Sequence, residues 1–204
     1  MNQQYVYIVF SSTPYKIGRM IRSITKDAYN HASVALDEDL TRMYGFARRY
    51  CNVPLYGGFV RESQSRFCHK GINSTVKVHK IPVTQEQYQA LEARIDGMYE
   101  NRDAYLYNHL SFLAVPLRKP IRVRDAYTCL EFCVDVMNSV GLDVTPGKYY
   151  SIRDVLEFLE PYTLYEGPMP QQSEFDADFF AKRPIPHPTI TSAKCILQLV
   201  PRLK

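Results

Sequence analysis

Cys129 and His31 are the two residues whose types and predicted positions best suit nucleophilic catalysis. Cys129 stands at the expected start of a helix, where exposed backbone N–H groups and the helix dipole favour the thiolate over the thiol. A thiolate can attack a carbonyl, and a histidine beside it can serve first as base and then as acid. His31 stands at the start of an expected strand, 98 residues before Cys129, so only the fold can bring the pair together.

The residue pattern alone also fits simpler roles for these residue types. A cysteine on an apolar helix is commonly a core residue, and Cys133, one turn further on, is expected to pack there. A lone histidine is commonly a surface or hydrogen-bonded residue. His79 is expected to be of that kind, pointing outward from a strand between Lys77 and Lys80.

The elements that would position the pair follow from residue spacing. β-branched and aromatic residues predict strands at 5–11, 31–36, 43–48 and 74–82, with an acidic turn at 37–39. Gly57 and Gly58 are expected to form a turn, and residues 195–200 a last strand. Apolar spacing predicts helices at 17–25, 84–101, 108–115, 128–140 and 152–159, and Thr84 with Gln87 resembles a capping box. The fold class is therefore α+β.

Composition is that of one globular domain. The chain has 204 residues, of which 46% are hydrophobic and 23% charged, and these values exclude a disordered tail, a collagen-like repeat and a coiled coil. The net charge of +4 is a mild excess, whereas nucleic-acid binders concentrate positive charge into a stripe. The basic run at 118–124 contains no aromatic residue, so nucleic-acid binding is not expected.

Cysteine usage and the ends of the chain predict a compartment. Five cysteines are an odd number, which argues against a disulfide framework and for a reducing environment. The first residues lack the features of a signal peptide, and no apolar stretch is long enough to span a membrane. We therefore expect a cytoplasmic protein with no membrane partner.

Short segments resemble motifs of the circularly permuted NlpC-type, papain-like hydrolases, which include the YiiX-like proteins. Residues 29–36, YNHASVAL, are similar to the histidine strand, with a small residue and then apolar alternation after the histidine. Residues 127–132, YTCLEF, resemble the cysteine helix, and residues 57–62, GGFVRE, resemble uncharacterised bacterial members. The histidine precedes the cysteine, as in the permuted order.

The resemblance covers roughly residues 1–167, which we expect to form the permuted papain-like domain. Residues 168–204 are rich in proline and are expected to be an extension wrapping the same domain. Within it, the acidic and aromatic stretch 174–180 is expected to cover the surface, with a lid over the cleft or a dimer contact as alternatives.

The resemblance implies a papain-like fold in which an antiparallel sheet packs against helices. It implies Cys129 as the nucleophile and His31 as the general base, with the backbone N–H of Cys129 in an oxyanion hole. The implied activity is that of a cysteine peptidase or amidase, which hydrolyses a peptide or small amide through a thioester and uses no cofactor or metal.

Two positions depart from the family pattern. Ala47 stands where YiiX-like members carry the carboxylate that orients the imidazole. The candidates to replace that carboxylate are Asp37, Tyr44 and Glu62, and without a replacement the site is a Cys–His dyad. Leu130 stands where a small polar residue is common and would make the cleft more apolar.

Two other readings stay open at this level. A papain-like cleft could have lost catalysis and bind a small amide or amino acid instead, which requires no activated thiolate. Alternatively, Cys129 and Cys133 share a helix face and could join Cys68 and His69 in a zinc site. Adjacent residues such as Cys68 and His69 rarely both bind one metal, so the zinc site is the weaker reading.

Overall fold

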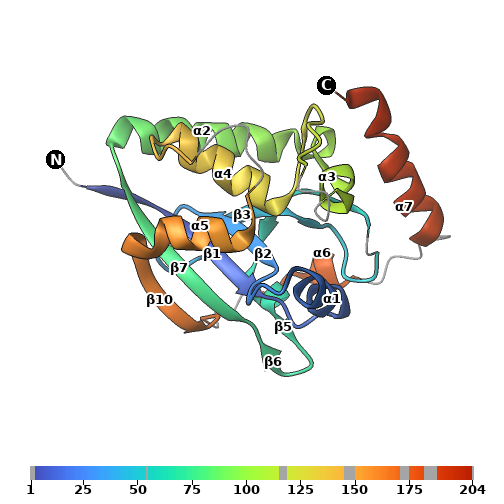
Figure 1. Ribbon diagram of the computed structural model, residues 1–204, viewed down its shortest axis with the longest axis horizontal. Helices are drawn as coiled ribbons and strands as arrows, with labels where there is room; N and C mark the ends of the chain where they lie inside the picture. The colour runs from blue at the N-terminus through green and yellow to red at the C-terminus, as the bar shows by residue number, and fades with distance from the viewer. Residues whose placement is uncertain are drawn as a thin grey trace.

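The computed structural model describes residues 3–53, 55–114, 119–144, 150–170, 175–181 and 188–203, and its centre is a curled eight-stranded sheet (Figure 1). The strand order is β10-β7-β1-β2-β3-β4-β8-β9. Neighbouring strands run antiparallel except β8 and β9, which are parallel. The fold is therefore α+β with a mixed sheet, where an antiparallel sheet was expected. The strands are β1 Gln4–Ser12, β2 His31–Ala35, β3 Met43–Arg48, β4 Gly57–Glu62, β7 Thr75–Val83, β8 Leu106–Tyr107, β9 Ala126–Tyr127 and β10 Thr163–Pro168.

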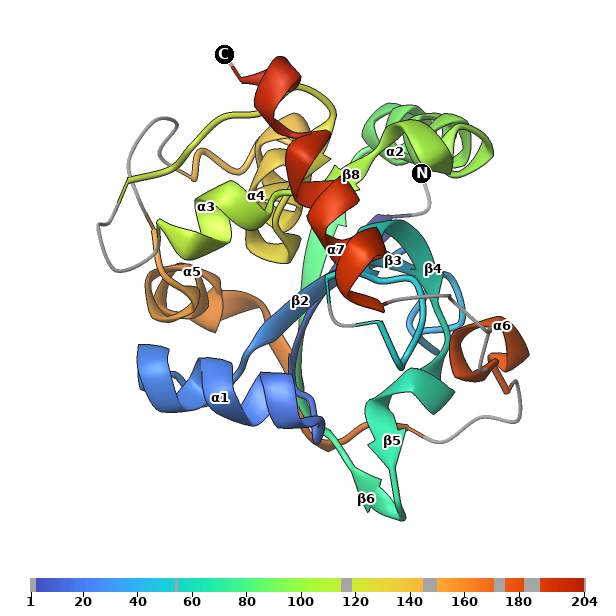
Figure 2. The ribbon, with the colours of Figure 1, turned by 90° about the vertical axis from the view of Figure 1, so that its right-hand side faces the viewer.

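Helices cover the sheet and close its ends. Figure 1 shows α2 and α4 side by side along the sheet and α5 crossing it, while Figure 2 looks at the end where α1 and α6 flank the curled strands. A hairpin of β5 (Cys68–His69) and β6 (Ile72–Asn73) projects from this end. The helices are α1 Lys16–Thr25, α2 Gln85–Glu100, α3 His109–Leu113, α4 Cys129–Ser139, α5 Ile152–Leu159, α6 Ala177–Phe180 and α7 Pro188–Leu197.

Reciprocal capping boxes begin three of these helices. Thr84 with Gln87 begins α2, as expected, and Ser151 with Asp154 begins α5. In each case the hydroxyl accepts from a backbone N–H that lacks a partner within the helix, and the acidic or amide side chain returns to the backbone of the cap. Such caps fix the first residue of a helix, which matters most for α4, described below.

The core lies on both faces of the sheet. On one face, Phe10, Phe46 and Phe59 pack with Phe132 of α4 and Ile95 of α2. The other face carries a smaller cluster, whose members include Val9, Leu40, Met43, Phe67, Val76 and Met169. Because both faces are covered, the central strands are almost entirely buried.

The expected turn at Gly57 and Gly58 is wrong, because both residues open strand β4. Their lack of a side chain serves a close approach of neighbouring backbone instead. A Cβ atom on Gly58 would lie 2.4 Å from the carbonyl oxygen of Tyr105, and one on Gly57 would lie 2.9 Å from Cβ of Tyr107. The glycines thus let the segment that carries β8 pack against β4.

The expected outward position of His79 is also wrong. His79 is fully buried, with its ring 5.7 Å from the ring of Phe10. Its side chain points to the face of the sheet that carries Phe10, where a turn of 3-10 helix at Glu160–Tyr162 contacts β7. Strand β10, which the sequence pattern did not reveal, follows this turn and pairs with β7, with Thr163 opposite His79.

The last segments differ from expectation as well. The strand expected at 195–200 is absent, because α7 continues to Leu197 and a turn of 3-10 helix follows at Val200–Arg202. The expected helix at 108–115 is present as the shorter α3, and residues 115–118 of that prediction and of the basic run lie outside the described residues, as does Glu174. Among the helices described, none is long and apolar enough to cross a bilayer.

Candidate active site

The N-terminus of α4 meets the first residue of β2, and this junction brings Cys129 and His31 together. The Thr128 hydroxyl accepts a hydrogen bond from the Glu131 N–H (3.1 Å), and the Glu131 carboxylate accepts one from the Thr128 N–H (2.6 Å). This capping box makes Cys129 the first residue of α4. The Cys129 sulfur is buried and interacts with the imidazole of His31 and the backbone N–H of Ala32.

A buried carboxylate holds the other side of the imidazole. His31 Nε2 lies 2.8 Å from Oε1 and 3.1 Å from Oε2 of Glu62. The hydroxyl of Ser33 donates to Oε2 of Glu62 and lies 3.2 Å from His31 Nε2. The Glu62 side chain is only 3% exposed, so its charge is stabilised by these partners and not by water. Because Glu62 occupies Nε2, Nδ1 is the nitrogen left to exchange a proton with sulfur.

Glu62 reaches the histidine across an intervening strand. Its strand, β4, pairs with β3, which in turn pairs with β2. The gap that admits the carboxylate is at Gly45 of β3, where a Cβ atom would lie 3.0 Å from Oε2 of Glu62. A larger residue at this position would therefore push against the carboxylate.

Of the three candidates to orient the imidazole, Glu62 is the one that contacts it. Asp37 instead accepts a hydrogen bond from the backbone N–H of Thr41 (2.8 Å) in the turn after β2. Tyr44 stacks on Phe59 in the core. Ala47 pairs with Gly58 in the sheet and contributes no polar group.

The electrostatics of the cluster favour an ion pair between cysteine and histidine. Burial alone would lower the pKa of His31, but the charge of Glu62 and the contact with Cys129 raise it to about 10. Burial alone would raise the pKa of Cys129 and that of Glu62, but their interactions with His31 lower both. The imidazolium and the thiolate therefore stabilise each other, with Glu62 fixing the charge on the ring.

Tyr107 is a further polar group at the sulfur, and the sequence pattern did not point to it. Its hydroxyl interacts with the Cys129 side chain and with the Cys129 backbone. Burial raises the pKa of Tyr107 well above its usual range, so the hydroxyl keeps its proton. The protonated hydroxyl of Tyr107 and the N–H of Cys129 are therefore two hydrogen-bond donors near the sulfur.

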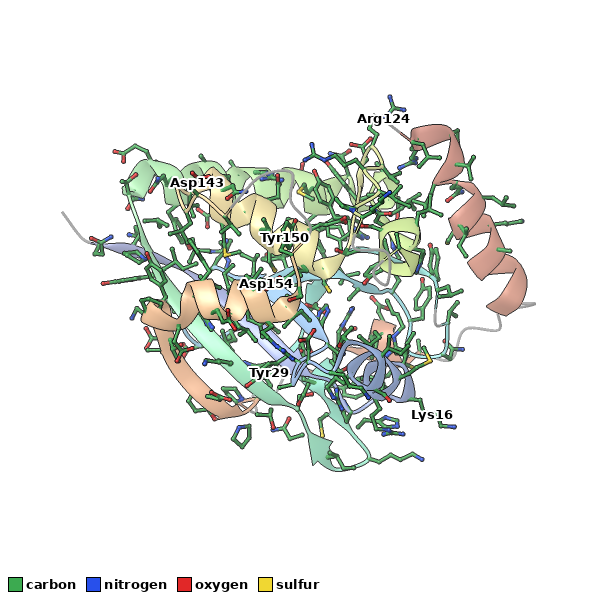
Figure 3. The ribbon with its side chains drawn as sticks, in the orientation of Figure 1. Lys16, Tyr29, Arg124, Asp143, Tyr150 and Asp154 are labelled. Atoms are coloured by element: carbon green, nitrogen blue, oxygen red, sulfur yellow. The ribbon has the colours of Figure 1, made fainter. Side chains whose placement is uncertain are left out.

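These residues line a cavity with a volume of about 120 Å³. His31, Cys129 and Tyr107 lie on it together with apolar side chains of α1 and of the sheet, such as Ile21 and Phe46. Tyr29 precedes His31 by two residues, and Figure 3 shows it between α5 and α1. A cavity of this size accommodates one small acyl or amino-acid group next to the thiol.

The four residues of the alternative zinc site, Cys129, Cys133, Cys68 and His69, do not come together in the described structure. Cys133 is fully buried in the core, where burial raises the pKa of its thiol well above the usual range. Cys68 and His69 form β5, and the His69 ring lies tilted against the Tyr15 ring, with centroids 4.8 Å apart. Within the described residues, no group of three or more His, Cys, Asp or Glu side chains could hold a metal ion.

Comparisons with known proteins add one distant structural similarity. No family model matches the chain, and no curated protein matches it. Among solved structures, the crystal structure of the type VI secretion system effector TseH aligns with 79% of this chain and 88% of its own, at 16% sequence identity and a TM-score of 0.38.

Proposed function

We propose that this protein is a cysteine hydrolase of the permuted papain-like type, which cleaves an amide bond in a peptide or small amide. The observation that carries the proposal is the buried array of Cys129, His31 and Glu62 at the start of α4. A structural cysteine needs neither a paired histidine nor a lowered pKa, and perturbed pKa values of this kind cluster at functional sites. The order of histidine strand before cysteine helix supports the family assignment.

The reaction would proceed through a covalent intermediate. The Cys129 thiolate attacks the substrate carbonyl carbon, and the new oxyanion accepts hydrogen bonds from the Cys129 N–H and the Tyr107 hydroxyl. The C–N bond breaks as the His31 imidazolium gives its proton to the leaving amine, which leaves a thioester on Cys129. Neutral His31 then takes a proton from water, the hydroxide attacks the thioester, and the acid leaves as the thiolate is restored.

Each neighbour of the pair has a place in this scheme. Glu62 fixes the ring orientation and stabilises the imidazolium, which is the role of the carboxylate in Ser-His-Asp sites. Ser33 holds the carboxylate in turn. Ile21 and Phe46 make part of the cavity wall apolar, and an apolar wall strengthens electrostatic interactions inside the cavity. The small cavity favours a compact substrate.

Alkylation of individual cysteines tests the activated pair without knowledge of the substrate. The pKa of a free cysteine thiol is about 8.5. We expect iodoacetamide to modify Cys129 well below that pH, and we expect His31→Ala to abolish this low-pH reactivity. The alkylation reactions are run between pH 5 and 9, and mass spectrometry of each cysteine peptide measures the extent of modification. The partly exposed Cys51 and Cys68 serve as internal references, and His79→Ala is the matched histidine control.

The same experiment separates a hydrolase from a module that only binds. A cleft that binds an amide without cleaving it needs no thiolate. If Cys129 titrates as an ordinary thiol in both the parent protein and His31→Ala, the hydrolase proposal is wrong. If Cys129 passes this test, a library of amides and short peptides identifies the substrate.

A further inference from the structure

Arg48 carries a positive charge that no described residue neutralises. It is the last residue of β3 and lines the same cavity as Cys129. Its guanidinium donates to the carbonyl oxygen of Cys51 (3.0 Å) and lies over the rings of Tyr15 and Phe179, whose centroids are 4.7 and 5.9 Å from the guanidinium carbon. Among the described residues, no carboxylate pairs with it. Burial lowers the pKa of Arg48, the direction expected of a cation that lacks a counter-ion.

Arg66, on the same cavity, makes the contrast clear. Its Nε lies 2.6 Å from a carboxylate oxygen of Asp176, so its charge is compensated within the protein. Arg66 also contacts the Phe179 ring, as Arg48 does. The two arginines thus share an aromatic neighbour, but only Arg66 has an anionic partner among the described residues.

Tyr15 supplies a second unsatisfied group at the same place. Its side chain lines the cavity beside Arg48, and the residue is more than nine-tenths buried. The Tyr15 hydroxyl is buried and has no hydrogen-bond partner in the described structure. A buried hydroxyl without a partner is costly and rare in native proteins. An unpaired cation and an unpaired hydroxyl in one cavity together call for an anionic acceptor.

The position of Arg48 sets the distance of that acceptor from the reaction. Phe46, two residues earlier on the same face of β3, contacts Phe132 in the first turn of α4, near Cys129. Arg48 and Cys129 also line one cavity of about 120 Å³. A carboxylate bound by Arg48 would therefore share this small space with a carbonyl at the sulfur.

We propose that the cavity selects amide substrates that carry a carboxylate close to the scissile bond, with Arg48 binding the carboxylate and Tyr15 donating a further hydrogen bond. This inference rests on the proposed hydrolase function for the scissile bond, and on Arg48 and Tyr15 for the carboxylate. A guanidinium suits this task because its planar donors match a carboxylate in a bidentate pair. The apolar walls make that pair stronger than it would be in water.

A pair of thiol reagents tests the carboxylate preference directly. N-ethylmaleimide is neutral, and 3-maleimidopropionate carries a carboxylate on a similar chain. We expect the anionic reagent to modify Cys129 about tenfold faster than the neutral one, a ratio typical of one charge-assisted hydrogen-bonded pair. Within Arg48→Met the ratio of the two rates should fall close to one, and Tyr15→Phe should lower the ratio a fewfold.

Matched variants separate the local effect from a change in net charge or folding. Arg124→Met removes a charge from an exposed residue that projects at the edge of the molecule (Figure 3), and it should leave the ratio unchanged. If Arg48→Met folds poorly, Arg48→Lys replaces it in the test. Arg48→Lys retains the charge and should retain part of the preference for the anionic reagent. A ratio that is the same in the parent protein and in both Arg48 variants would overturn the proposal.

Equilibrium binding keeps the inference testable even if Cys129 proves unreactive. N-acetylglutamate α-amide and N-acetylglutamine amide differ only in the charged group, and their binding is measured by calorimetry. We expect the carboxylate ligand to bind about tenfold more tightly to the parent protein and equally to Arg48→Met. Equal binding of the two ligands to the parent protein would refute the carboxylate site. An unreactive Cys129 that retains the tenfold preference would refute only the hydrolase.

Discussion

His31, which is largely buried, and His79, which is fully buried, lie on the same sheet, and their pKa values move in opposite directions. The pKa of His31 is raised to about 10, and that of His79 is lowered to about 4. Burial disfavours the charged form in both cases. The difference lies in the partners. His31 has Glu62 at 2.8 Å and Cys129 at its other side, whereas both ring nitrogens of His79 are buried without a hydrogen-bond partner in the described structure.

The comparison shows that burial makes a histidine either inert or reactive, depending on what is buried with it. Lys77, Glu160 and Glu166 act on His79 from a distance, with opposing signs, and their net effect does not offset the loss of water. At His31, the carboxylate of Glu62 and the sulfur of Cys129 outweigh the loss of water. The three predictions that follow alter one side of this comparison at a time.

Removing the Glu62 charge should have the largest effect. Glu62→Gln keeps the shape of the side chain but removes the charge that raises the pKa of His31. Burial should then lower the pKa of His31, as it lowers that of His79. Without the imidazolium, the thiolate fraction of Cys129 at pH 6 should fall by roughly 10²–10³-fold, because an ordinary thiol is almost fully protonated there. The rate of iodoacetamide modification of Cys129 measures this change. Glu160→Gln, which removes the exposed carboxylate paired with Lys77, should leave the rate unaltered.

Replacing His79 should remove part of the acid sensitivity of the fold. The pKa of His79 is about 4 in the folded chain, against its usual 6.5. Between these values the unfolded chain binds more protons, so the free energy of unfolding falls as the pH drops from 6.5 to 4, by up to about 3 kcal/mol. His79→Leu should flatten this dependence, measured as the difference between urea unfolding curves of the two proteins. Parallel pH profiles would contradict this assignment.

Filling the gap under Glu62 should have a smaller effect on the same pair. Gly45→Ala places a methyl group 3.0 Å from the Glu62 carboxylate and should shift it by a few tenths of an ångström. We expect roughly tenfold slower modification of Cys129 at pH 6, given the sensitivity of such sites to misplacement. Gly97→Ala is the control, because a Cβ there meets nothing within 4 Å on the surface of α2 and improves helix propensity. Equal rates in both variants would show that Gly45 does not position the carboxylate.

Local sequence signals predicted the elements that carry the pair, and the contacts between those elements required the structure. The apolar alternation after His31 and the helix start at Cys129 are local features, and β2 and α4 begin where they indicate. Glu62 was one of three candidates because its contact with His31 depends on the register of β3 and on the gap at Gly45. Neither feature can be predicted from the sequence around position 62.

The same limit explains what was missed or mistaken. Tyr107 lies on β8, a strand of two residues that has no periodicity to detect. Strand β10 is largely exposed, so it lacks the buried apolar pattern by which strands are found. The 3-10 turn at Glu160–Tyr162, which contacts β7, likewise has no local pattern that predicts the burial of His79. Long-range pairing, and not local propensity, decided the surroundings of each of these residues.

The contribution of α6 to the cavity has a consequence for biosynthesis. A ribosome adds His31, then Cys129, and only some fifty residues later Phe179, whose ring lies on the cavity and whose carbonyl accepts from the Cys51 N–H at 2.9 Å. Domains begin to fold as they emerge, from the N-terminal side first. A nascent chain therefore carries neither the assembled pair before α4 emerges nor the finished cavity wall before α6 does.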